Sequence, residues 1–117
     1  MNKLSITEIL EMTETIAIAC GWQCKKDDEE VWVYPVKEDP GCGWYFNPYE
    51  DWNDWHLACD TLKVYLIFFE ENGVWFCHLE SDKCKNIKQR SHEDKRISAF
   101  KMLHDIAVNK IEGEKNA

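Results

Sequence analysis

The residues with the clearest chemical potential in this sequence are a histidine and a cysteine about one helical turn apart. His56 and Cys59 have the spacing at which an imidazole can activate a thiol, as a cysteine-dependent enzyme requires. Both residues fall on the tryptophan-bearing face of an expected helix, and burial in apolar surroundings raises the pKa of a thiol. No carboxylate on that face is placed to orient the histidine. We therefore predict no catalytic residue, and a small cysteine-dependent enzyme stays an alternative.

The other cysteines, histidines and glycines form no recognisable metal or nucleotide motif. The six Cys and four His are spread along the chain, without the paired Cys-x2-Cys knuckles of a zinc site. The five Gly are also scattered, and no glycine-rich phosphate-binding loop occurs. We therefore predict neither a metal nor another cofactor, and we expect most of the cysteines to be small buried hydrophobic residues.

Acidic and aromatic side chains gather in two segments that suit protein binding. Aromatic rings beside charged groups are typical of protein interfaces. One segment is an acidic turn, and the other is an aromatic loop that leads into a helix. The candidate binding residues are Asp27, Asp28, Glu29, Glu30, Trp44, Tyr49, Glu50, Asp51, Trp52 and Asp54. In a competing interpretation the rings fill the second face of a sheet, and the loop carboxylates favour a helix N-terminus, where the helix dipole stabilises negative charge.

The net charge favours a basic protein partner. The chain of 117 residues has a formal net charge of −8, and opposite potentials speed the encounter of two proteins. Basic residues are concentrated between positions 83 and 101, which we interpret as a solvated loop and a helix start. Because an acidic chain is repelled from a duplex, the charge argues against direct nucleic-acid binding.

The composition indicates a single folded domain over residues 1–117. Apolar residues make up 44% and aromatic residues 13% of the chain, far more than a disordered acidic chain contains. No apolar run reaches the roughly 18 residues of a membrane span, so no membrane association is expected. Acidic residues at positions 8, 11 and 14 interrupt any signal-peptide core. We therefore expect a cytoplasmic protein with reduced cysteines.

Hydrophobic periodicity predicts three helices, over about residues 5–20, 51–62 and 93–111. Ser5 with Glu8 and Ser91 with Asp94 have the spacing of a capping box. Gly21 and Gly113 should end the first and third helices. The second helix has an alternative, earlier start that uses residue 47 as its cap. We expect an ordered core over about residues 4–112 and a frayed end over 113–117.

The same spacing predicts the buried faces of the helices. The first face begins with Ile6 and ends at Cys20. The second carries Trp52, Trp55, His56 and Cys59, and the third carries Ile97, Phe100, Leu103, Ala107 and Ile111.

Strand signals occur in two hairpins. Residues 22–25 and 31–34 flank the acidic turn, and a third short strand is expected over 43–46. The runs 64–69 and 74–79 are joined at Asn72-Gly73, which suits a type I′ turn and sets Phe69 opposite Phe76. Both faces of this hairpin are apolar, so each needs a cover. We therefore predict an α+β domain in which helices pack on both faces of an antiparallel sheet, a helix–sheet–helix sandwich.

Two segments of the chain resemble a known family. Residues Asn47 to Trp55 (NPYEDWNDW) are similar to a Pro-containing lead into a Trp-bearing helix, and Lys95 to Leu103 (KRISAFKML) to a closing alanine-containing helix. Both resemble the phage ABA-sandwich domain family of small phage and prophage proteins. The resemblance implies helices on both faces of a sheet and a phage or prophage origin. The family carries no assigned activity, so the resemblance implies no catalytic residue.

Together these observations predict a small acidic cytoplasmic protein that acts by protein–protein contact on a host or phage component. Inhibition of a host-defence enzyme is the more specific hypothesis. The alternatives are an immunity-type protein that neutralises a basic toxin, a small cysteine-dependent enzyme, and a self-associating protein that forms a homo-oligomer.

Overall fold

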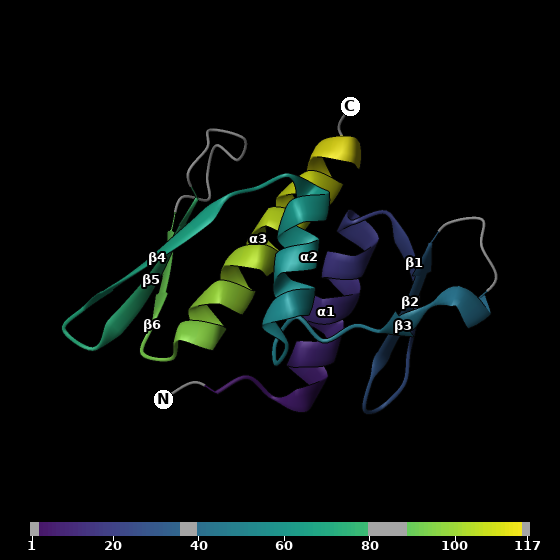
Figure 1. The fold of residues 1–117 in the computed structure, drawn as a ribbon, viewed down its shortest axis with the longest axis horizontal. Helices are drawn as coiled ribbons and strands as arrows, with labels where there is room; N and C mark the ends of the chain where they lie inside the picture. The colour runs from purple at the N-terminus through teal and green to yellow at the C-terminus, as the bar shows by residue number, and fades with distance from the viewer. Residues whose placement is uncertain (1–2, 36–39, 80–88, 116–117) are drawn as a thin grey trace.

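Within residues 3–35, 40–79 and 89–115, which the computed structural model describes, three α-helices lie between two antiparallel sheets (Figure 1). The helices are α1 (Ile6–Ala19), α2 (Trp52–Leu62) and α3 (Lys95–Lys115). The first sheet contains β1 (Trp22–Lys26), β2 (Val31–Pro35) and β3 (Trp44–Tyr45), with a short 3-10 turn, η1 (Pro40–Cys42), before β3. The second sheet contains β4 (Leu66–Glu71), β5 (Val74–Leu79) and β6 (Gln89–His92).

The α+β class and the antiparallel pairing of the strands are confirmed, but the order of the layers differs from the expected one. The chain forms two sheets with the helices between them, instead of one sheet between helices. α1 packs on β1 and β2, α3 packs on β5 and β6, and α1 and α3 pack on each other. The two hairpins lie on opposite sides of the helical layer, and no strand pairing joins them among the described residues. Each hairpin therefore buries one apolar face against the helices.

The sequence signals at both ends of α1 are confirmed. The Ser5 hydroxyl accepts a hydrogen bond from the Glu8 N–H at 3.1 Å, and the Glu8 carboxylate accepts one from the Ser5 N–H at 3.2 Å. Gly21 has a φ of +85°, which glycine adopts without strain. Ile6, however, was expected on the buried face and is 68% exposed. Within α1 the core contacts begin at Ile9 and Leu10, which lie ahead of the buried Thr13 and Ile16.

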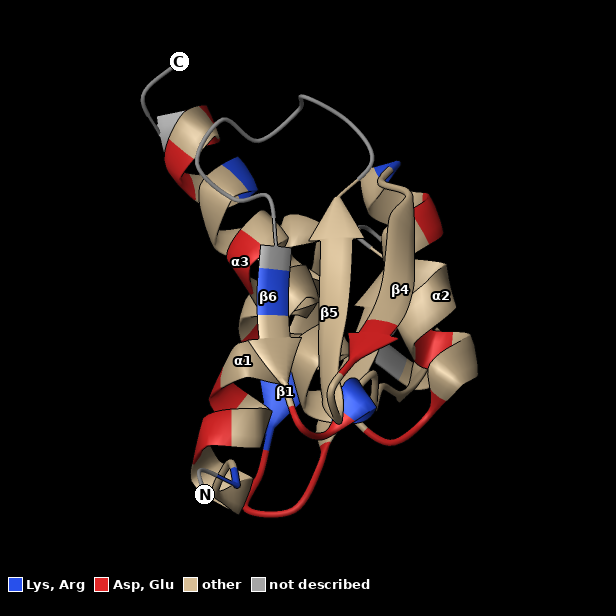
Figure 2. Cartoon of the chain, turned by 90° about the vertical axis from the view of Figure 1, so that its left-hand side faces the viewer, with Lys and Arg blue, Asp and Glu red and all other residues tan. Residues whose placement is uncertain are grey.

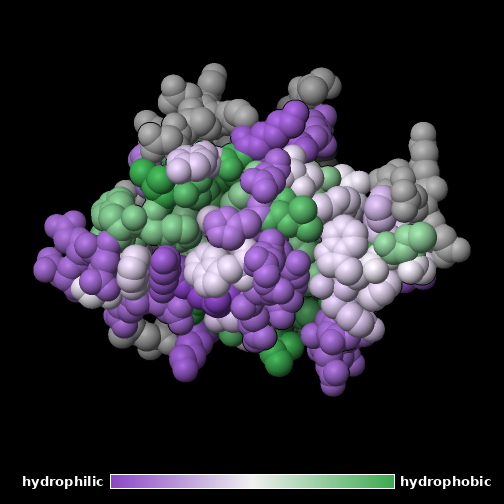
Figure 3. Space-filling view, in the orientation of Figure 1, coloured by the Kyte–Doolittle hydropathy of each residue, from purple (hydrophilic) through white to green (hydrophobic). Residues whose placement is uncertain are grey.

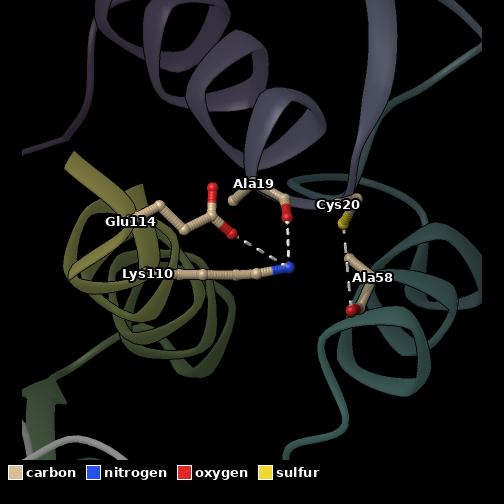
Figure 4. Close-up of polar contacts among 5 residues, drawn as sticks. All are labelled: Ala19, Cys20, Ala58, Lys110 and Glu114. Atoms are coloured by element: carbon tan, nitrogen blue, oxygen red, sulfur yellow. Dashed lines mark hydrogen bonds and ion pairs between the residues drawn. The ribbon is translucent and has the colours of Figure 1, made fainter. Parts of the chain in front are cut away.

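Polar contacts tie the C-terminal end of α1 to the other two helices (Figure 4). The Lys110 ammonium donates to the Ala19 carbonyl oxygen at 2.9 Å and lies 3.9 Å from the Glu114 carboxylate. The Cys20 thiol lies 4.0 Å from the Ala58 carbonyl oxygen of α2. A cation at a helix C-terminus satisfies a carbonyl without an intrahelical partner and favours the helix dipole. Lys110 therefore links α3 to α1 through this carbonyl.

Replacing Lys110 with methionine is expected to lower the free energy of unfolding by about 1 kcal/mol, because the Ala19 carbonyl loses its charged donor while the aliphatic stem is kept. Urea denaturation followed by circular dichroism measures this change. Lys25→Met on the exposed part of β1 is the matched control, with an expected effect within about 0.5 kcal/mol. Equal effects of both substitutions would contradict the role of Lys110.

The second hairpin has the predicted register. Phe69 lies opposite Phe76 and Leu66 opposite Leu79, and the turn residues Asn72 and Gly73 have φ values of +54° and +80°. Its inner face buries Cys77 and Leu79 against the helices. The expected cover on its outer face is absent among the described residues: β4 leaves Ile67 37% and Phe69 42% exposed. The two hairpins meet the same helical layer, so no described helix is left for the outer face (Figure 2).

The segment before α3 differs from the sequence prediction. Residues 89–92 were expected in a solvated loop and instead form β6, in which Ser91 pairs with Phe76 of β5. α3 is capped by Asp94, whose carboxylate accepts from the Arg96 N–H at 2.8 Å. Ser91 therefore belongs to a strand and is not the cap. The rest of the basic run before position 89 lies outside the described residues.

The C-terminal end of α3 also differs from the prediction. α3 continues through Gly113 to Lys115, although an end at Gly113 and a frayed segment over 113–117 were expected. Gly113 lacks the positive φ of a helix-ending glycine. Residues 116 and 117 lie outside the described part of the chain.

Candidate binding groove

A groove of about 380 Å³ opens between the first turns of α1, the β1–β2 turn and the segment from β3 to α2. Its apolar walls include Ile9 and Leu10 of α1 and Phe46. Ile6 and Tyr45 also line it, and they are 68% and 59% exposed. A concave surface with exposed apolar side chains is where a folded domain most often takes a ligand or a partner.

Three carboxylates line this groove beside its apolar side chains. Glu29 and Glu30 line it from the acidic turn, and Glu50 lines it beside Tyr49. All three glutamates are exposed, and none of the described lining residues is Lys or Arg. Four of the ten candidate binding residues, from two segments about 20 positions apart, are thus brought to one groove. The groove combines apolar contact area with negative charge.

The acidic turn is ordered by one of its own carboxylates. Asp27 accepts hydrogen bonds from the N–H groups of Glu29 and Glu30, both at 2.7 Å, and its own N–H donates to the Glu30 carbonyl oxygen at 3.0 Å. These two backbone donors hold the pKa of Asp27 below its ordinary value. Asp27 and Asp28 line a neighbouring hollow with Leu10 of α1. Asp27 therefore positions the two glutamates at the groove.

The opposite wall is fixed to the core. The Arg96 guanidinium donates to the Tyr49 carbonyl oxygen at 2.7 Å, and the Tyr49 ring lies edge-on to Phe100 at 5.1 Å. The Asn47 side-chain oxygen accepts from the Glu50 N–H at 3.1 Å. Partial burial, ahead of nearby charges, raises the pKa of Tyr49. The wall is therefore held in place before any partner arrives.

The contact between the two segments comes from the pairing of β2 with β3. The Phe46 N–H donates to the Val31 carbonyl oxygen at 2.9 Å, directly after the acidic turn. This bond places the loop that follows Phe46 beside Glu30. Sequence reasoning missed Ile6, Ile9, Leu10, Tyr45 and Phe46 as groove residues, and no spacing signal connects these positions. The helical spacing instead placed Ile6 on the buried face of the first helix.

Two candidate carboxylates outside the groove serve the start of α2. Asp51 caps the helix by accepting from the Asn53 N–H at 2.8 Å, so the alternative earlier start at residue 47 is wrong. Asp54 accepts from the Asn47 N–H at 2.8 Å. Partial burial raises the pKa of Asp54, against the opposing effect of this hydrogen bond. These contacts agree with the competing interpretation of the acidic loop, in which its carboxylates stabilise the start of a helix.

The two candidate tryptophans also make internal contacts. Trp44 lies edge-on to Trp22, with ring centroids 5.3 Å apart. Trp52 packs against Phe68 of β4 at 5.9 Å, and the Lys95 ammonium lies 5.7 Å from its ring centroid. Both tryptophans are half-buried. The structure therefore does not place them in the groove with Tyr49.

The histidine and cysteine of α2 are not arranged as a catalytic pair. Cys59 is 5% exposed, and burial raises the pKa of its thiol well above the ordinary value. His56 is exposed, although it was expected on the buried face. Burial also raises the pKa of Cys20 and Cys77 to about 12. Such thiols stay protonated at neutral pH, which disfavours nucleophilic attack.

Alkylation of the native protein is expected to distinguish these thiols. Cys42 is exposed, whereas Cys59 and Cys77 are buried with raised pKa values. We expect iodoacetamide to modify Cys42 at neutral pH at least ~100-fold faster than Cys59, because the thiolate is the reactive form. Peptide mass spectrometry after timed quenching gives the rate at each site, and the urea-unfolded chain is the control. Faster labelling of native Cys59 would instead support the cysteine-dependent enzyme.

Across the three described ranges, no group of three His, Cys, Asp or Glu side chains lies close enough to hold a metal ion. None of the helices in these ranges is long and apolar enough to cross a membrane.

No family model, curated protein or solved structure matches this chain. The resemblance to the phage ABA-sandwich family therefore stays a prediction. The proposed function therefore rests on the groove and its charges.

Proposed function

We propose that the protein is a non-enzymatic protein-binding module whose groove takes a basic, partly apolar segment of a partner protein. The observation that supports this most is the position of Glu29, Glu30 and Glu50 beside the exposed surface of Ile6 and Tyr45. Apolar side chains of the segment would cover this surface, and Lys or Arg beside them would meet the carboxylates. Such a combination gives both contact area and orientation.

The size and charge of the groove agree with a short segment. Its volume of about 380 Å³ is at the lower end of the range of ligand sites, which suits a few side chains and not a whole domain. The formal charge of −8 attracts a basic protein at long range. Because exposed carboxylates are screened by salt, the association is expected to weaken as ionic strength rises.

We propose that the module acts in the cytoplasm, where free thiols persist, on a host or phage component, with inhibition of a host-defence enzyme as the main candidate. The two segments that resemble the phage ABA-sandwich family add a phage or prophage origin. An immunity-type protein that neutralises a basic toxin uses the same groove and charge, so the identity of the partner distinguishes the two.

Affinity capture from a host lysate with charge-reversed variants tests the proposal. The wild-type protein is compared with Glu29→Lys/Glu30→Lys, which changes the groove, and with Asp60→Lys/Glu112→Lys, which makes the same charge change at exposed positions elsewhere. We expect one basic protein to be retained by the wild type and the control at low salt, and at least ~10-fold less by the groove variant. Quantitative mass spectrometry measures the retained amounts.

Two outcomes would contradict the proposed function. Equal retention by the groove variant and the control variant would show that net charge, and not the groove, selects the partner. Recovery of no protein by the folded wild type at low salt would leave the groove without a partner in that cell. Circular dichroism of each variant confirms that the fold is retained.

A further inference from the structure

The second sheet ends at β4, whose outer edge has no strand beside it among the described residues. The strand order is β4-β5-β6, so β4 hydrogen-bonds to β5 on one side only. Figure 2 shows the three strands from their outer side, with β4 at one edge and few charged residues across the sheet. An unpaired edge presents a row of N–H and C=O groups to another chain.

The register of the hairpin determines which groups face this edge. Glu71 and Val74 flank the two-residue turn, so their backbone groups bond to each other. Backbone direction alternates along an antiparallel strand, and Phe69 therefore also bonds towards β5. The N–H and C=O groups of Leu66, Phe68 and Glu70 consequently point away from β5, towards the open edge.

These three residues form an edge that is complementary to itself. If a second copy approaches antiparallel with Phe68 opposite Phe68, Leu66 of each copy lies opposite Glu70 of the other. The outward-facing N–H and C=O groups of all three residues then lie opposite outward-facing N–H and C=O groups of the second copy. No carboxylate lies opposite a carboxylate in this register, so the pairing avoids the repulsion of like charges.

The outer face of β4 adds apolar area to this pairing. Tyr65, Ile67 and Phe69 are 69%, 37% and 42% exposed, and the Phe69 ring stacks on Phe76 with centroids 4.9 Å apart. In the same register Ile67 of each copy lies opposite Phe69 of the other. The space-filling view shows apolar residues gathered over this part of the molecule (Figure 3). Edge strands of monomeric proteins commonly carry charged side chains, especially Lys, or Pro. β4 carries neither Lys nor Pro, and its two charged residues, Glu70 and Glu71, are confined to the end beside the turn.

We propose that a second copy of this chain pairs antiparallel with β4, so that the two second sheets join into one continuous sheet across a two-fold axis. The groove is lined by the start of α1, the β1–β2 turn and the segment from β3 to α2. The first sheet, to which these strands belong, lies across the helical layer from β4 (Figure 1). The dimer therefore leaves both grooves open and presents two of them to a partner.

Analytical ultracentrifugation of the full chain over a range of concentrations tests this pairing. We expect the wild type to sediment with twice the mass of one chain. Glu70→Pro removes an N–H at the open edge without removing a bond to β5, and Ile67→Lys places a charge on the exposed face. Both variants are expected to shift the population to monomer, by at least ~10-fold in dissociation constant.

Ile18→Lys is the matched control, because Ile18 is a 51% exposed isoleucine on α1, away from β4. This variant is expected to remain dimeric, and circular dichroism confirms the fold of all three. A wild type that stays monomeric, or a dimer that persists in both β4 variants, would overturn the proposal. A dimer that Ile18→Lys also abolishes would show general apolar association instead of strand pairing and would overturn it as well.

Discussion

Replacing Gly43 with alanine is expected to lower the free energy of unfolding by about 3 kcal/mol, close to the upper end of what overpacking costs. A Cβ atom at this position would lie 2.7 Å from Trp32 Nε1 and even closer to the Val33 carbonyl oxygen. Val33 is fully buried in β2, so its backbone cannot move aside without disturbing the core. Urea denaturation followed by circular dichroism measures the loss.

Gly113→Ala is the matched control for Gly43→Ala. Gly113 lies within α3, and apart from its chain neighbours and the adjacent helix backbone no described atom lies within 4 Å of the position that its Cβ would take. Alanine loses less backbone entropy than glycine in a helix, so this variant should gain about 0.5–1 kcal/mol. The two substitutions are chemically identical and should differ in sign. Destabilisation of both variants by the same amount would contradict the close approach of Gly43 to β2.

Trp55→Ala is expected to cost about 3–5 kcal/mol, the range observed when a buried aromatic side chain is removed. Trp55 is 2% exposed, and its ring lies 5.4 Å from that of Trp52 and 5.5 Å from that of Phe68. Its indole N–H donates to the Ala99 carbonyl oxygen of α3 at 3.0 Å. The side chain thus links α2 to α3 and to β4, and its loss leaves a cavity where they meet. Urea denaturation again measures the change.

Two further variants separate packing from general effects on α2. Trp55→Phe keeps most of the ring contacts and loses the hydrogen bond to α3, so its cost should fall between those of the wild type and Trp55→Ala. Leu57→Ala removes a 40% exposed side chain from the same helix and should change stability by no more than about 0.5 kcal/mol. A cost for Leu57→Ala similar to that of Trp55→Ala would contradict the placement of Trp55 in the core.

Local structure followed closely from local sequence. The capping box at Ser5, the left-handed Gly21 and the Asn72-Gly73 turn all involve groups a few residues apart. The free energies of these local structures depend on backbone geometry, which the residue types largely determine. The register of the second hairpin follows from its turn for the same reason.

Longer-range features could not be derived in this way. β6 forms because residues 89–92 find the free edge of β5, and their own sequence is too polar to indicate a strand. Once these residues pair, α3 begins after them with Asp94 as its cap. Both faces of the second hairpin are apolar, but the helical cover that this pattern predicted for the outer face is absent among the described residues. Whether a sheet face is covered depends on where distant elements pack, and periodicity carries no information on that.

For the candidate site, composition and local patterning placed Glu29, Glu30, Tyr49 and Glu50 among the ten candidate binding residues. Their types and the turns around them are local properties. Only the folded chain shows that these residues share one groove and that Ile6 completes it. That arrangement depends on the bond between Phe46 and Val31 across paired strands. Contacts between residues far apart in sequence are set by packing of the whole domain, and for this reason only the tertiary structure could reveal the groove.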